Sequence, residues 1–209
     1  MDYSDGWSLA LTAAMRKLLC GMCVLVAMPG AASAQQTLRD QVLKNGVSEE
    51  LVITDYPMLS VRALADSAGA VVHVSVRSSD TFVSSDGNTV LTDYRVAIVG
   101  VVKDSASRLT PGEVVTIRRV GGTLNIEGRN FLSNEAGFAP FSTAAEYVLF
   151  LKTDSGQPFE MLAGPQSAYL VREGAVASLT NSGQRPALVP TEVFLSDVRE
   201  FSGRTSGTR

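Results

Sequence analysis

The sequence is poor in the side chains that most catalytic and metal sites require. Its 209 residues include one histidine, His73, and two cysteines. A serine hydrolase of the nucleophile-elbow type needs a G-x-S-x-G motif, which is missing. Zinc or a transition metal needs more histidine or cysteine ligands than the chain has. His73 could act as a general base, but its place on a predicted strand favours a structural role. We therefore expect no catalytic residues, no metal site and no cofactor.

Basic residues do not dominate the chain either. Lysine and arginine number 18, against 21 aspartates and glutamates, and the formal net charge is −3. The pair Arg118 and Arg119 falls on opposite faces of one predicted strand, so it makes no basic patch. Nucleic acids and anionic membranes both select strongly basic surfaces. The charge balance therefore argues against either as a partner.

Residues 1–34 have the features of an N-terminal extension and an export signal. A basic start at Met15 precedes an apolar run over residues 18–28, and Ala32 and Ala34 have the A-x-A spacing that signal peptidase reads. The run is too short to cross a bilayer core, which needs about 20 residues. We expect Met15 to be the true start, and the mature protein to be periplasmic or secreted with no membrane anchor after cleavage.

Hydrophobic alternation predicts a β domain organised around residues 70–103. The even-numbered residues from Ala70 to Val76 form an apolar face, and a second alternating run follows after residue 89. The polar segment from Ser78 to Thr89 is typical of a turn, so these two strands should be antiparallel. Further strands are expected over residues 113–120 (continuing through 123–127), 146–152, 159–162, 168–172 and 175–179, with a long irregular connection over 130–143.

Capping residues predict helices around this β domain. Thr37 and Gly46 bracket a short helix, Ser60 begins a helix before the first strand, and Thr191 begins a C-terminal helix. The predicted fold is mainly β: a small antiparallel OB-like barrel of five to six strands over residues 60–179. It is preceded by a lead-in over 35–59 and followed by a linker and the C-terminal helix over 180–203, with a disordered tail over 204–209.

Several short motifs occur in a familiar order. They are V-V-K at residues 101–103, P-G-E at 111–113, E-Y-V-L-F-L at 146–151 and G-P-Q at 164–166. In this order the chain resembles exported bacterial proteins of unknown function. More distantly it is similar to the netrin-like module of the tissue inhibitors of metalloproteinases, which implies an OB-type barrel over residues 60–179. Those inhibitors grip the protease metal with an N-terminal cysteine. Here Cys20 and Cys23 leave with the leader, so the resemblance implies the fold and not that mechanism.

Two groups of residues are candidates for binding. Phe131, Phe138 and Phe141 lie in the connection over 130–143; they either fill the core at a barrel end or form an exposed apolar patch for a partner. The hairpin over residues 80–93 has several oxygen ligands that could bind Ca²⁺, although ordinary turn chemistry explains them equally well and no EF-hand spacing is present. These are Asp80, Asp86, Asn88 and Asp93.

Three functions follow as hypotheses. The leading one is a non-catalytic exported binding module that engages another exported protein or an envelope component through the connection over 130–143 and the neighbouring hairpin tips. A carboxylate-dependent hydrolase is the second, because two facing carboxyl groups suffice for glycoside chemistry. A structural accessory subunit of an envelope complex is the third. The sequence names no ligand for any of them.

Overall fold

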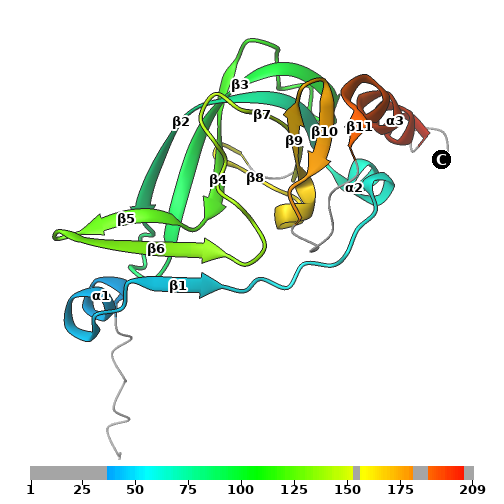
Figure 1. The fold of residues 1–209 in the computed structure, drawn as a ribbon. Coiled ribbons are helices and arrows are strands. Elements are labelled where there is room, and N and C mark those ends of the chain that lie inside the picture. The colour runs from blue at the N-terminus through cyan, green and yellow to red at the C-terminus, as the bar shows by residue number, and fades with distance from the viewer. Residues whose placement is uncertain (1–36, 153–155, 181–187, 205–209) are drawn as a thin grey trace, which may run out of the picture. The chain divides into compact units, whose positions relative to one another are not determined.

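The computed structural model describes residues 37–152, 156–180 and 188–204. The predicted leader with Met15, Ala32 and Ala34, much of the linker, and the tail beyond residue 204 lie outside this part. The fold is mainly β, as predicted, with two sheets and three α-helices (Figure 1). The strands are β1 Glu49–Val52, β2 Ala70–Val83, β3 Val90–Asp104, β4 Val114–Val120, β5 Gly122–Ile126, β6 Arg129–Glu135, β7 Glu146–Leu151, β8 Phe159–Glu160, β9 Ala168–Arg172, β10 Ala175–Ser178 and β11 Val189–Pro190.

The larger sheet has eight strands in the order β11-β10-β9-β7-β2-β3-β4-β8. Neighbouring strands are antiparallel except β4 and β8, which are parallel. The predicted closed barrel of five to six strands is not confirmed, because this ladder is open and runs from β11 to β8. Beyond the ladder, β7 and the residue that follows β8 share one isolated bridge, between Leu151 and Met161.

The central pair β2 and β3 is longer than the sequence predicted. Residues 78–83, which were expected to belong to a turn, continue β2 and pair with residues 90–95 of β3. The reversal is confined to the residues after Val83, where the Ser84 N–H donates to the Thr89 carbonyl at 2.8 Å. Thr81, Phe82 and Val83 are residue types that favour strands, and Val83 packs against the part of the core that lies between the small sheet and α1 (Leu38–Asn45), so extension is favoured there.

The prediction of an irregular connection over 130–143 is wrong for its first half. β5 and β6 form a hairpin, and β1 adds to β6 in parallel, which makes a separate sheet in the order β1-β6-β5. Residues 123–127 therefore do not continue β4. Gly121 and Gly122, with φ of 91° and 139°, turn the chain out of the main sheet at the start of β5.

The core has three parts. The inner face of the main sheet packs around Val72, Val74 and Val96, and its other face is covered by α2 and α3 through Leu64 and Val198. The small sheet packs on α1. The helices are α1 Leu38–Asn45, α2 Val61–Ser67 and α3 Thr191–Arg204, with a 3-10 turn at Gly164–Ser167.

The predicted helix caps are largely confirmed. The side chains of Thr37 and Ser60 accept hydrogen bonds from the third backbone N–H that follows, and Gly46 closes α1 in a left-handed conformation. Thr191 is the first residue of α3 rather than a cap before it, and Ala68 rather than Gly69 ends α2. Within the described residues, none of the helices is long and apolar enough to span a membrane.

Candidate functional site

All three candidate phenylalanines are buried. Phe131 packs under α1, while Phe138 and Phe141 belong to the core of the main sheet. The Phe141 ring centre lies 4.9 Å from that of Tyr94 and 4.6 Å from that of Tyr147. The rings therefore fill the core, which is the first alternative, and their side chains do not form the exposed apolar patch of the second.

Arg119 is the unexpected residue beneath them. It follows Val115 and Ile117 on the inward face of β4, and only 4% of its side chain is exposed. Its guanidinium lies over the Phe138 ring, with Cζ 3.2 Å from the ring centre, and donates to the carbonyls of Ala139 at 2.9 Å and Phe138 at 3.4 Å. The alternation of β4 predicted an inward side chain at this position, and the cation there needs a compensating charge.

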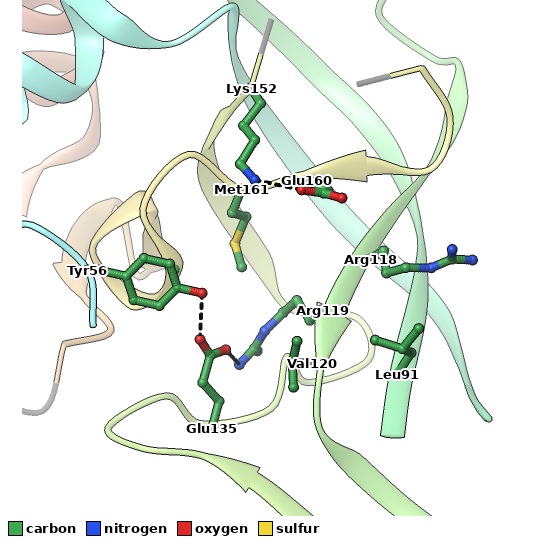
Figure 2. A pocket seen from close by; sticks show the side chains of 10 residues that line it. Tyr56, Leu91, Arg118, Arg119, Val120, Glu135, Lys152, Glu160 and Met161 are labelled. Carbon is green, nitrogen blue, oxygen red and sulfur yellow. Dashed lines mark hydrogen bonds and ion pairs between the residues drawn. The ribbon is translucent and has the colours of Figure 1, made fainter. Parts of the chain in front are cut away.

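That charge comes from Glu135, at the end of β6. Its side chain is also 4% exposed, and its Oε2 lies 3.8 Å from Arg119 Nη2. The Tyr56 hydroxyl donates to Glu135 Oε1 at 2.9 Å (Figure 2). The Tyr56–Glu135–Arg119 network thus joins the main sheet, the small sheet and the segment that connects β1 to α2.

The connecting segment, residues 53–60, is fastened beside Tyr56 by two further contacts. Gln166, in the 3-10 turn, accepts from the Leu59 N–H at 2.8 Å and donates to the Pro57 carbonyl at 3.1 Å. Gly164 has φ of 49°, and a Cβ at this position would overlap the Tyr56 ring. The Tyr56 ring can therefore pack closely against the 3-10 turn only because residue 164 is glycine.

Burial sets the protonation behaviour of this network. Desolvation lowers the pKa of Arg119 to about 10, although the charge of Glu135 opposes that shift. Desolvation, followed by the hydrogen bond to Glu135, raises the pKa of Tyr56 to about 12. Both groups remain protonated at neutral pH, so the network is a fixed ion pair with a neutral hydroxyl donor.

Glu135 lines two hollows. The first, of about 370 Å³, is the one drawn in Figure 2. The second is a more open groove of about 490 Å³, which reaches from β1 to the end of β10. The first hollow is lined by Tyr56, Leu91, Arg118, Arg119, Val120, Glu135, Lys152, Glu160, Met161 and Gly164. The groove is lined by Leu51, Asn134, Glu135, Gly137, Phe138, Ala139, Pro140, Ser178, Leu179 and Thr180.

The charges that line the first hollow are largely paired. Lys152 Nζ lies 2.6 Å from Glu160, and Arg118 donates twice to Asp93, at 2.7 Å each. Glu135 and Glu160 both line this hollow, and the carboxylate-hydrolase hypothesis requires two carboxyl groups that face each other. Each, however, is paired with a cation, and a glycosidase acid has to be kept neutral by its surroundings. This arrangement favours ion pairing over acid catalysis.

The remaining candidate residues make contacts within the fold that account for their positions. His73 Nε2 lies 2.8 Å from Glu146 Oε2 on the neighbouring strand. In the hairpin considered for calcium, Asp93 pairs with Arg118, and Asp86 takes part in the turn through the Asn88 N–H. Within the described residues, no group of three or more histidine, cysteine, aspartate or glutamate side chains is placed to hold a metal ion.

Sequence reasoning missed three residues of the site. They are Tyr56, Glu135 and Gln166, whose side chain accepts from Leu59 and donates to Pro57. Tyr56 and Glu135 are 79 positions apart, so no local pattern links them. No model of a known protein family matches this chain, and no curated protein sequence matches it.

Proposed function

We propose that this protein is an exported, non-catalytic binding module that engages another exported protein or an envelope component. The groove beside Glu135 carries the proposal. It is open, and its lining combines the apolar residues Leu51, Pro140 and Leu179 with the polar residues Asn134, Ser178 and Thr180. An open hollow that combines apolar and polar lining residues is common at binding surfaces.

The rigid floor of this groove supports the same function. Phe138 and Glu135, which line it, are held by the buried Arg119. A surface whose shape is fixed before binding loses little conformational entropy when a partner docks. Ala139 and Pro140 are exposed and belong to the connection over residues 130–143, which the sequence predicts as the interaction region. This connection therefore remains part of the proposed surface, although its phenylalanines are buried.

The OB-like barrel and the export of the protein belong to this proposal as well. The Lys152 N–H donates to the Glu160 carbonyl at 3.0 Å, and the Leu162 N–H donates to the Phe150 carbonyl at 2.9 Å. These bonds link the end of β7 to β8, which itself pairs with β4, and this supports a barrel-like arrangement of β7, β2, β3, β4 and β8. Export is supported by the A-x-A site at Ala32 and Ala34.

In-cell photo-crosslinking tests the binding function. The photoreactive residue p-benzoylphenylalanine is placed at Ala139, which is exposed and lines the groove, and at the matched control position Val99, which is exposed on β3 outside it. We expect a discrete protein adduct from position 139 and none from position 99. Equal labelling at the two positions, or no adduct at 139 in cells that export the protein, would contradict the proposal.

A further inference from the structure

We propose that the free edge of β1 binds an extended, basic segment of the partner protein as an additional strand. This inference rests on the proposed function, because it names the chemistry of the partner at the surface beside the groove. β1 lies at the edge of the small sheet: β6 pairs with one side of it, and no strand of the described residues pairs with the other (Figure 1).

The hydrogen-bond pattern shows which backbone groups are available. The carbonyls of Ser48 and Val52 accept from the N–H groups of Leu132 and Ala136, respectively. The backbone N–H and C=O groups of alternate residues from 48 to 52 therefore point toward β6. The backbone N–H and C=O groups of the residues between them, Glu49 and Leu51, and of Ile53 point away from β6. In the part of the chain that the structure describes, those outward backbone groups have no hydrogen-bond partner. An incoming strand would pair with them directly.

Exposed apolar side chains accompany this edge. Leu51 is 61% exposed, Ile53 is 78% exposed, and Met58 farther along the same segment is 85% exposed. Three large apolar side chains within eight residues are exposed while the rest of the chain buries most of its own. A strand added to β1 would cover Leu51 and Ile53, which project from the same face because they are two residues apart.

The charges of the segment specify a basic occupant. Residues 47–58 contain Glu49, Glu50 and Asp55 and no lysine or arginine. None of these three carboxylates has an ion-pair partner in the described structure. An incoming strand in which lysine or arginine alternates with apolar residues would place its apolar face beside Leu51 and Ile53. Its basic face would then lie beside Glu50, which projects from the opposite face of β1.

A second copy of the chain fits this edge less well. Pairing two β1 strands would bring four glutamates of the same sign to one short edge, where like charges repel. β1 is four residues long, about 13 Å of edge at roughly 3.3 Å per residue. That length is short for an interface that has to bury the roughly 1,200 Å² of a stable pair. A partner strand gains further contact because Leu51 also lines the groove.

Fluorescence anisotropy with the peptide KVKVKV and the full chain tests the inference. KVKPKV is the control peptide, because it has the same charge but its proline prevents strand pairing. We expect KVKVKV to bind at least about tenfold more tightly than KVKPKV. In hydrogen exchange, KVKVKV should slow the Leu51 amide and leave the Val52 amide, which faces β6, unchanged.

Three protein variants complete the experiment. Glu50→Lys should weaken the binding of KVKVKV at least about tenfold. Leu51→Pro should do the same, because it removes an outward N–H without removing a bond to β6. Asp80→Lys, an exposed charge reversal on the β2–β3 hairpin, is the matched control and should leave binding within about twofold. The Glu50→Lys variant keeps the test informative if Leu51→Pro fails to fold.

The outcomes separate this inference from the function on which it rests. Equal binding of the two peptides, an unprotected Leu51 amide, or a dimer in sedimentation that Leu51→Pro dissociates would overturn the basic-strand assignment. If position 139 still crosslinks a partner in cells while the edge variants leave that adduct unchanged, the binding function stands and the strand-pairing inference fails.

Discussion

The guanidinium carbon of Arg119 lies 3.2 Å from the centre of the Phe138 ring, in a core whose buried residues are mostly apolar. A cation over an aromatic face is stabilised by the ring's quadrupole, and the stabilisation grows when water is excluded. Arg119 also faces Glu135. The position of the loop that carries Phe138 is therefore tied to an ion pair between the two sheets.

Removing one member of that pair should be costly. Arg119→Met leaves the Glu135 carboxylate buried, and Glu135→Gln leaves the Arg119 cation buried, so each should lower the free energy of unfolding by about 3–5 kcal/mol. The double variant leaves neither charge and should lose clearly less than the sum of the two. Urea unfolding of all four proteins measures this coupling. Additive losses would show that the two side chains do not act as a pair.

The sequence predicted one half of this arrangement. Alternation along residues 113–120 placed Arg119 on the same face as Val115 and Ile117. The balancing acid could not be found in the same way, because the sequence of the segment that carries Glu135 predicts an irregular connection and not a strand. β6 contains Asn130, Ser133 and Asn134, residue types that strands seldom use, and its pairing with β1 and β5 outweighs that local preference.

Elements with strong local signals were predicted well. The caps at Thr37 and Ser60 depend on the few residues that follow them, and the apolar run of β7 is buried as expected. The barrel was less predictable, because strand order depends on contacts between segments far apart in the sequence. The parallel pairing of β4 with the two-residue strand β8 is one example.

Gly164→Ala should displace Tyr56. The added methyl group would overlap the tyrosine ring, and φ of 49° is unfavourable for alanine, so a loss of about 1–3 kcal/mol in the free energy of unfolding is expected. Gly137→Ala is the matched control: its φ of 71° is also positive, but a Cβ there meets nothing within 4 Å. Thermal or urea unfolding compares the two. In a Tyr56→Ala background, Gly164→Ala should cost no more than Gly137→Ala does.

Phe131→Ala should act on stability alone. The ring is fully buried between the small sheet and α1, and truncating such a side chain costs about 3–5 kcal/mol. Ile53→Ala is the opposite case, because a side chain that is 78% exposed contributes little to folding. We expect Ile53→Ala to leave the free energy of unfolding within about 0.5 kcal/mol while weakening partner capture at position 139. A Phe131→Ala variant as stable as the wild type would contradict the buried assignment.

Alkaline pH should expose the contribution of Tyr169. Burial raises the pKa of its hydroxyl from 10.0 to about 12. Between these two pH values the hydroxyl therefore stays protonated in the folded state but ionises in the unfolded chain. The stabilisation is complete below about pH 10 and is lost as the pH approaches about 12. The difference between these two pKa values corresponds to about 3 kcal/mol in the free energy of unfolding. Arg119 acts in the opposite direction, since its pKa is lowered to about 10 and its burial becomes less costly as the pH rises above that value.

The comparison that isolates this effect is between the wild type and Tyr169→Phe. The phenylalanine variant has the same ring and no ionisable hydroxyl, so its stability should fall less between about pH 9 and about pH 12, while the Arg119 contribution is common to both proteins. Urea unfolding at several pH values gives the two curves, and absorbance near 295 nm should show one tyrosine fewer ionising late in the variant. Parallel stability curves would mean that the Tyr169 hydroxyl ionises in the folded protein as freely as in the unfolded chain.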